Sequence, residues 1–472
     1  MTASNTGNDA VSPPPRQHVV LFPFMSKGHT IPLLHLARLL LLRRRISVTF
    51  FTTPANRPFI AQSLADTSAA IIDLPLPENV AGIPAGVEST DGLPSMSLFW
   101  SFASATELMK PDFDRALRNL DPPVSFLVSD AFLWWTLESA AKFGFPRLVS
   151  FGSSTYAMTV GAVVAMSGVL KQSETITVPG FPWIKANKDE FDGMFPNPEA
   201  DPIAVEFSMK FVGAISKSFG IISNTFYELE PVFIDHWNRE IGPKKLQGRC
   251  SLEEKLEKRS GSVLYVAFGT QAKLPSEQIR EIAKGLEELN VNFLCVIRKP
   301  KDETAEGCFP DGFENRVKNR GMVVRDWVDQ MKILKHESIQ GFLSHCGWNS
   351  VLESISAGVP ILAWPMMAEQ PLNAKMVVEE LKVGLRVETS DGSVNGFVKS
   401  EALKKMVEEL MEGEMGNEVR KKVKEVADMA KKAMEEGGSS WQALDLLIDE
   451  AANSDSLIEK VRINPCELML EK

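Results

Sequence analysis

An apolar strand, a short polar turn and an amphipathic helix follow one another in each half of this chain. In the first half these are HVVLFPF, MSKGHT and IPLLHLARLLLLRR; in the second half, GSVLYVAFGT leads to a helix that starts at Ser276. Continuous apolar strands of this kind belong to parallel sheets that are covered on both faces. The pattern therefore predicts an α/β protein made of two similar halves, each built on a parallel sheet.

The length of the chain and the restart of this rhythm divide it into domains. A chain of 472 residues is longer than one hydrophobic core usually supports. We expect a first domain over residues 17–245 and a second over residues 260–450, joined by a polar linker over residues 246–259. Residues 1–16 are predicted to be disordered. Residues 451–472 are a C-terminal tail, which is free to pack back on the first domain.

Charge and composition argue against several classes of partner. The net charge is −10, whereas nucleic-acid binding calls for a basic face. The longest mildly apolar run is too short to span a bilayer, and the N-terminus lacks the apolar core of a signal peptide. The five cysteines lie far apart, which favours free thiols in a reducing compartment. We therefore expect a cytoplasmic monomer without nucleic-acid partners or a membrane span.

The stretch SHCGWNSVLES places polar side chains where a strand gives way to a helix. A helix start offers free N–H groups and a partial positive charge, which suit phosphate. His345 and Asn349 add side-chain donors, so the stretch predicts a diphosphate cradle beyond the carboxyl end of a parallel strand. The alternative is structural: Ser350 and Glu353 match a capping box, and Trp348 is then a core residue. A Gly-x-Gly-x-x-Gly fingerprint and a P-loop lysine are both missing, which argues against an NAD-dependent dehydrogenase and against ATP.

His29 occupies the corresponding position in the first half, between a strand and a helix. A histidine at a helix N-terminus tends to stay neutral, and a neutral imidazole can accept a proton. Asp130 ends another predicted strand of the same sheet, so it can meet the imidazole and fix its tautomer. No Gly-x-Ser-x-Gly nucleophile elbow accompanies them, which suggests that the substrate brings the nucleophile. The structural alternative is an ordinary loop histidine beside a strand-end cap.

The segment from Trp327 to Gln370 resembles the signature box of plant secondary-metabolite UDP-glycosyltransferases. It begins with Trp, ends in Glu-Gln, and contains HCGWNS with the later Glu, Gly-x-Pro and Trp-Pro of that box. FPFMSKGHTIPLLHLARLL and SVLYVAFGT also resemble this family, and the resemblance covers about residues 17–450. It implies a GT-B fold, in which two Rossmann-like domains face each other across a cleft. It also implies inverting transfer of a sugar from a UDP-sugar to a small lipophilic acceptor, with no metal and no cofactor.

The resemblance further implies roles for individual residues. His29 matches the base that deprotonates the acceptor hydroxyl, and Asp130 matches its partner. The residues that match contacts to the donor are Trp327 and the Val328 backbone for uracil, Gln330 and Glu353 for ribose, Thr270, His345, Asn349 and Ser350 for the diphosphate, and Trp348, Glu369 and Gln370 for the sugar.

The family associates a terminal Gln of the box, here Gln370, with glucose, so UDP-glucose is the predicted donor. The acceptor pocket is expected in the first half and would take a flat phenolic or flavonoid-like molecule, giving a β-glucoside. The candidates for this pocket are Phe24, Met25, Trp100, Trp134 and Trp183. Transfer to nitrogen, sulfur or carbon stays open. The segment between the halves is short for this family, which leaves a catalytically idle small-molecule or nucleotide-sugar binding protein as the alternative.

Overall fold

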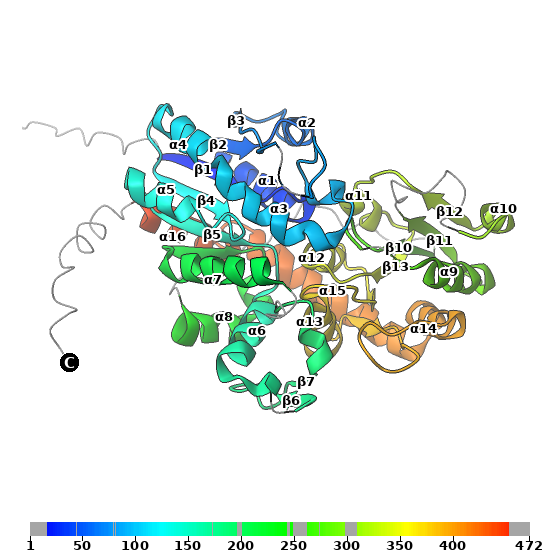
Figure 1. Cartoon of the computed structure of the whole chain (residues 1–472). Helices are drawn as coiled ribbons and strands as arrows, with labels where there is room; N and C mark the ends of the chain where they lie inside the picture. The colour runs from blue at the N-terminus through cyan, green and yellow to red at the C-terminus, as the bar shows by residue number, and fades with distance from the viewer. Residues whose placement is uncertain are drawn as a thin grey trace, which may run out of the picture.

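The computed structural model describes residues 17–43, 45–78, 80, 82–171, 173–195, 201–242, 246–248, 262–272, 274–297 and 309–452. In that part of the chain two parallel sheets form, one in each half, with helices on their faces (Figure 1). The predicted disordered N-terminus, most of the predicted linker and nearly all of the C-terminal tail lie outside the described residues.

The first sheet has the strand order β3-β2-β1-β4-β5-β8-β9 in the described residues, and all neighbouring strands are parallel. Its strands are β1 (Gln17–Phe22), β2 (Ile46–Thr52), β3 (Ala70–Asp73), β4 (Phe126–Asp130), β5 (Arg147–Phe151), β8 (Gly220–Ser223) and β9 (Leu246–Gly248). Apolar runs predict strands over HVVLFPF (residues 18–24), VSFLVSD (residues 124–130) and FPRLVSF (residues 145–151), and all three are confirmed within two residues at each end. Residues 246–248, where the sequence placed the start of the linker, form the edge strand of this sheet.

Helices cover both faces of the first sheet. They are α1 (Lys27–Leu41), α2 (Arg57–Ser63), α3 (Phe99–Ala105), α4 (Lys110–Arg118), α5 (Thr136–Phe143), α6 (Thr155–Ser167), α7 (Pro202–Lys217) and α8 (Pro231–His236). The C-terminal helix α16 (Ser439–Ala452) joins them, because its Leu444 and Leu447 pack in one apolar cluster with Val19 and Leu21 of β1 (Figure 1). The sequence had grouped residues up to 450 with the second half, but α16 crosses back to the first.

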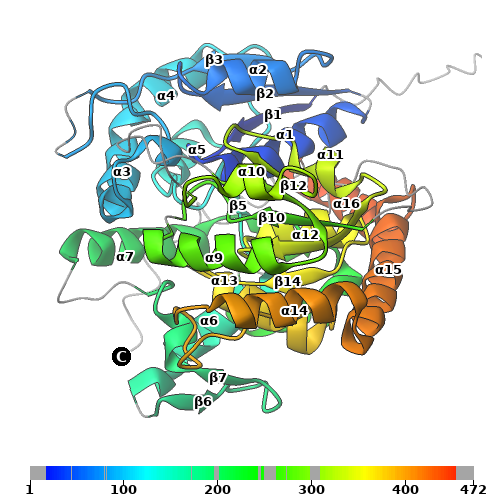
Figure 2. The ribbon, with the colours of Figure 1, turned by 90° about the vertical axis from the view of Figure 1, so that its right-hand side faces the viewer.

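The second sheet has the order β12-β11-β10-β13-β14-β15 within the described ranges and is also parallel. Its strands are β10 (Val263–Ala267), β11 (Asn292–Val296), β12 (Gly321–Val324), β13 (Ile339–Ser344), β14 (Ile361–Ala363) and β15 (Gly384–Arg386). Its helices are α9 (Ser276–Glu288), α10 (Phe313–Val317), α11 (Gln330–Leu334), α12 (Trp348–Ser356), α13 (Gln370–Lys375), α14 (Ser400–Glu412) and α15 (Glu414–Met434). Figure 2 shows α9 and α14 side by side on one face. No helix of the described ranges combines the length and the apolar character that a membrane span needs.

The two halves share one apolar cluster at their junction. It joins α6, α8 and the hairpin of β6 (Thr175–Thr177) and β7 (Lys185–Asn187) to α12, α13 and α15. Two buried polar contacts cross the same junction. Ser154 donates a hydrogen bond of 2.7 Å to Asn373, and the Glu190 carboxylate lies 3.6 Å from the Lys375 ammonium. These contacts fix the edge of one sheet against the edge of the other.

Candidate active site

His29 lies in the first turn of α1, beyond the carboxyl end of β1. The sequence placed it in the loop before the helix, but α1 already begins at Lys27, with Ser26 as the N-cap residue. The His29 Nδ1 atom lies 2.7 Å from Oδ2 of Asp130, the last residue of β4. The Asp130 Oδ1 atom accepts the backbone N–H of Phe132 at 2.9 Å. The structure therefore brings the predicted pair together and holds both oxygens of the carboxylate.

Opposing influences act on the pKa of His29. Burial lowers it, but the charge and the hydrogen bond of Asp130, with a smaller contribution from Glu369, raise it above its ordinary value. Glu369 precedes α13 in the second half, and burial raises the pKa of its carboxyl group. Asp130 therefore acts against the predicted preference of a helix start for a neutral imidazole. Because Nδ1 is engaged by Asp130, proton exchange with a substrate falls to Nε2.

Aromatic rings line the space beside His29. The ring centroids of Phe24 and Phe132 lie 5.6 and 5.4 Å from the imidazole. Phe132 also contacts the predicted acceptor residue Trp100 at 6.4 Å and Phe207 of α7 at 5.9 Å. Phe132 was missed by the sequence analysis, although its position two residues after the strand-end Asp130 was a usable signal.

The other acceptor candidates differ from one another in burial. Met25 and Trp134 are buried in the apolar cluster that contains Phe24. Trp183 is 54% exposed beside the β6–β7 hairpin, and its indole N–H donates to Glu380 at 3.4 Å. The structure does not bring Trp183 to the aromatic wall that Phe24 and Phe132 form beside His29.

His345 directly follows β13 at the corresponding edge of the second sheet. Burial lowers its pKa to about 4, so the imidazole is neutral at neutral pH. Its buried Nδ1 atom has no hydrogen-bond partner among the described residues. A Cβ atom added to Gly269 or Gly347 would lie 2.5 Å from its Nε2 atom, so both loops need glycine here. The orphan Nδ1 atom indicates a site that a polar ligand completes.

The start of α12 differs from the sequence prediction. Gly347 is the N-cap residue, and no side chain caps the helix. Ser350 and Glu353 lie inside the helix, so the predicted capping box does not form. The first-turn N–H groups are consequently available to an anion.

Gln330, Ser350 and Glu353 form one hydrogen-bonded group. The Gln330 Nε2 atom donates to Ser350 Oγ at 2.8 Å and to Glu353 Oε2 at 2.7 Å. Burial raises the pKa of Glu353 to about 7, while the bond from Gln330 opposes this. The structure thus joins two predicted ribose contacts with one predicted diphosphate contact.

Asn349 reaches across to the first half. Its Nδ2 atom donates to the Gly28 carbonyl at 2.5 Å, and its Oδ1 atom accepts from Asn224 at 3.3 Å. In a regular helix the N–H of residue 32 would bond that carbonyl, but Pro32 has none. The proline therefore leaves an acceptor that Asn349 uses, which ties the start of α12 to the helix that carries His29. Asn224 was missed by the sequence analysis, although it follows a parallel strand.

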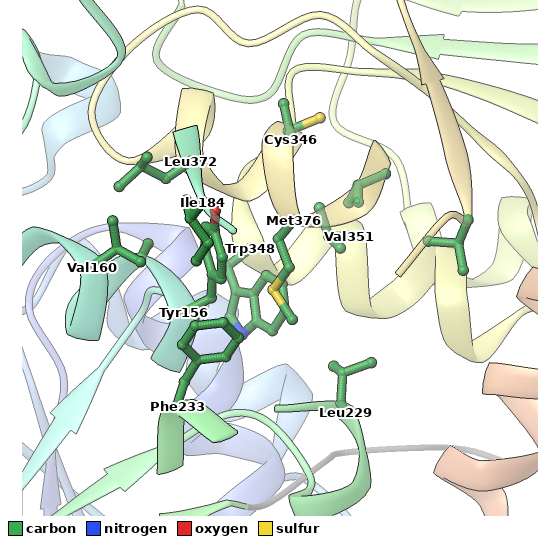
Figure 3. Close-up of a cluster of buried hydrophobic side chains, with 14 of the residues drawn as sticks. Tyr156, Val160, Ile184, Leu229, Phe233, Cys346, Trp348, Val351, Leu372 and Met376 are labelled. Atoms are coloured by element: carbon green, nitrogen blue, oxygen red, sulfur yellow. The ribbon is translucent and has the colours of Figure 1, made fainter. Parts of the chain in front are cut away.

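The Trp348 ring is turned away from this site. It is 1% exposed, and its indole N–H donates to the Asn224 carbonyl at 2.7 Å. Figure 3 shows it packed among Tyr156, Phe233 and Met376 at the junction of the halves. The ring therefore matches the structural alternative, and only the backbone of Trp348 lies at the start of α12.

The remaining predicted donor residues lie in loops or at the start of α13, around the same edge of the second sheet. The Trp327 ring is 49% exposed, with the Lys27 ammonium 5.6 Å from its centroid, and Val328 follows it before α11. Thr270 lies in the turn after β10. The Gln370 Oε1 atom accepts from the backbone N–H groups of residues 366 and 367 at 3.0 and 3.1 Å, which fixes the side-chain amide. No group of three or more metal-ligating side chains occurs among the described residues.

Similar proteins and solved structures indicate the family and the fold of this chain. The family model for UDP-glucoronosyl and UDP-glucosyl transferases matches residues 243–419. UDP-glycosyltransferase 90A1 of Arabidopsis thaliana is 52% identical over 468 residues, covering 93% of this chain and 97% of that protein. UDP-glucose flavonoid 3-O-glucosyltransferase 7 of Fragaria ananassa is 34% identical, covering 92% of this chain and 96% of that protein.

Solved structures match over a similar length. The structure of Phytolacca americana UGT2 with UDP-2fluoro-glucose and pterostilbene has a TM-score of 0.77 and 29% identity, covering 93% of this chain and 100% of that chain. Glycyrrhiza uralensis UGT73P12 with glycyrrhetinic acid 3-O-monoglucuronide has a TM-score of 0.80 and 29% identity, covering 94% and 97%. These matches confirm the predicted GT-B fold. The chain belongs to the plant UDP-glycosyltransferase family and is an enzyme that transfers sugars from UDP-sugars to small molecules.

Proposed function

We propose that this protein transfers glucose from UDP-glucose to a hydroxyl group of a small, lipophilic phenolic acceptor, with inversion at the sugar. The observation that carries this proposal is the His29–Asp130 pair at 2.7 Å, set beside the aromatic wall of Phe24 and Phe132. A flat aromatic acceptor can pack against these rings while its hydroxyl reaches the free nitrogen of the imidazole.

In the proposed reaction His29 acts as a general base. The acceptor oxygen attacks C1 of glucose while its proton passes to Nε2 of His29. The bond between C1 and the phosphate oxygen breaks, and its electron pair leaves with UDP. Because attack comes from the side opposite UDP, the α-linked sugar becomes a β-glucoside. Asp130 orients the imidazole and stabilises the imidazolium that forms.

The donor would lie across the edge of the second sheet. The neutral imidazole of His345 can donate a hydrogen bond to the diphosphate, and the uncapped start of α12 adds N–H groups and a partial positive charge. These groups would stabilise the negative charge that builds on the departing UDP. The other proposed contacts are Trp327 and the Val328 backbone to uracil, Gln330 and Glu353 to ribose, Thr270, Asn349 and Ser350 to the diphosphate, and the Trp348 backbone, Glu369 and Gln370 to the sugar.

Three observations support glucose and a phenolic acceptor. Gln370 ends the signature box, and its amide is held in one orientation by two backbone N–H groups. The Fragaria ananassa relative is by its name a flavonoid glucosyltransferase. The wall around His29 is built from aromatic rings, which suits an aromatic acceptor.

The test is acceptor-dependent release of UDP. The purified chain is incubated with UDP-glucose and a panel of phenols, and products are identified by mass. His29→Ala is run beside it, with His336→Ala as the matched control, because His336 is exposed at the end of α11. We expect a glucoside from the native chain and the control, and almost none from His29→Ala. UDP binding without turnover on any acceptor would favour the idle binding protein, and full turnover by His29→Ala would remove the proposed base.

A further inference from the structure

Arg147, the first residue of β5, is a buried charge that the proposed reaction does not use. Its side chain is 1% exposed. Arginine is almost never fully buried unless it is paired, yet the partners of this guanidinium in the described residues are carbonyl and hydroxyl oxygens, with no carboxylate in bonding contact. A cation kept in the interior at this cost calls for an explanation.

The guanidinium bonds the chain on both sides of Asp130. Its Nη2 atom donates to the Asp130 carbonyl at 3.1 Å and to the Leu133 carbonyl at 3.4 Å. Its Nε atom donates to Ser129 Oγ at 2.8 Å and to Thr136 Oγ1 at 2.9 Å. One planar group therefore fixes the strand end, the residue that holds His29, and the turn that follows it.

The charge of Arg147 also lies close to the pair. Burial lowers its pKa to about 9, and the negative charge of Asp130 opposes this, so the guanidinium is protonated at neutral pH. The other charged groups around His29 are Glu369 from the second half and, on its own helix, Lys27, which pairs with Asp91 at 3.8 Å. Arg147 is thus a cation that bonds the Asp130 backbone and interacts electrostatically with its carboxylate.

We propose that Arg147 is a positioning residue for sugar transfer, which fixes Asp130 and the Phe132 turn and offsets the negative charge of the Asp130 carboxylate. This proposal rests on the proposed role of His29 as the base. Without the guanidinium charge, the imidazolium form of His29 is favoured, so the base is neutral only at higher pH. Without the hydrogen bonds, the carboxylate is held less firmly, and a misplacement of about 1 Å near the reacting atoms can cost about a hundredfold in rate.

Three variants separate the charge, the hydrogen bonds and simple stability. Arg147→Met removes the charge and the bonds, and Arg147→Lys keeps the charge but loses the planar fork. Ser218→Ala is the control. Of the bonds that the guanidinium makes, it removes only the 2.9 Å bond from Nη1, and it also removes the 2.8 Å bond that Ser218 donates to the Ala214 carbonyl in α7. The measurements are kcat, KM for UDP-glucose, the pH profile of kcat/KM and the Tm.

For Arg147→Met we expect kcat to fall about tenfold or more and KM for UDP-glucose to stay within about twofold. The acid limb of the kcat/KM profile should move to higher pH by about half a unit. Arg147→Lys is expected to return the acid limb to its native position while kcat stays low. Ser218→Ala should lower the Tm and leave both kcat and the acid limb unchanged.

Several outcomes would overturn the proposal. One is native kcat and an unmoved acid limb in a folded Arg147→Met protein. If that variant does not fold, native kcat in Arg147→Lys decides against it. A loss of kcat in Ser218→Ala that matches its loss of Tm would reduce Arg147 to a stabilising residue. His29→Ala in the same assay keeps the two proposals apart: if it is active, the base assignment fails, whereas an inactive His29→Ala beside normal Arg147 variants removes only the positioning role.

Discussion

His29 and His345 lie beyond the carboxyl ends of strands in the two sheets. Their environments nevertheless shift their pKa values in opposite directions. His29 has a carboxylate 2.7 Å away, and this charge outweighs burial, so its pKa is raised. His345 has no such partner among the described residues, and the loss of solvation around its ring lowers its pKa to about 4. The same side chain is therefore suited to accept a proton in the first half and to remain a neutral hydrogen-bond donor in the second.

This difference follows from the partners that each half supplies. The first half places Asp130 at the end of the neighbouring strand β4, whereas in the second half the backbone of Gly269 and Gly347 approaches the His345 ring too closely to admit a Cβ atom. In both sheets the functional side chain lies beyond the carboxyl end of a parallel strand, where α/β proteins bind ligands. The residues on the neighbouring strand ends and loops determine the pKa of that side chain.

The largest effects should come from replacing each histidine in turn. We expect His29→Gln to lower kcat by about a thousandfold, because the general base is lost, and to leave UDP binding unchanged. His345→Gln should lower kcat about a hundredfold and weaken UDP binding about tenfold, because one donor to the diphosphate is lost. Steady-state kinetics and calorimetry with UDP measure the two effects. Equal loss of UDP binding in both variants would contradict the division of roles.

Asp130→Asn should make the environment of His29 more like that of His345. Loss of the carboxylate charge leaves burial as the main influence, so the pKa of His29 should fall. The base then stays neutral to lower pH, and the acid limb of kcat/KM should move down by about one pH unit, with a large fall in kcat. The pH profile measures this shift. An acid limb that stays in place would show that another group titrates.

Glu353 should make the binding of UDP-glucose, but not of the acceptor, depend on pH. Burial raises its pKa to about 7, so the carboxylate that would accept ribose hydroxyls is lost as the pH falls through 7. We expect KM for UDP-glucose to rise about threefold from pH 8 to pH 6 in the native chain, and to be nearly flat in Glu353→Gln. KM for the acceptor serves as the internal control. An unchanged slope in Glu353→Gln would assign the titration elsewhere.

The smallest effect tests where the acceptor wall lies. Trp183→Ala should change acceptor KM by less than about twofold, because this ring is exposed beside the hairpin and bonded to Glu380. Phe132→Ala, which removes a ring beside His29, should raise acceptor KM about tenfold or more. Acceptor kinetics on one phenol measure both variants. A larger effect for Trp183 would move the pocket toward the hairpin.

Much of the fold, and the pairing of His29 with Asp130, could be predicted from the sequence. Apolar runs predict β1, β4, β5 and β13, and the common edge of parallel strands predicts that His29 and Asp130 meet. The start of α1 was placed too late, because the helix was expected to begin at Ile31, directly before Pro32. Pro32 lies deeper in the helix, where the carbonyl that it leaves without a partner is bonded by Asn349 from the other half.

By itself, the sequence determined two parallel α/β halves, their order along the chain, and the residue types at each strand end, because these depend on short-range pattern. Only the tertiary structure decided that the Trp348 ring joins the core, that α16 crosses back to the first sheet, and that Arg147 bonds the Asp130 carbonyl. These depend on contacts between segments far apart in the chain. The directions of the pKa shifts of the two histidines were decided in the same way, because burial and charge are properties of the assembled surroundings.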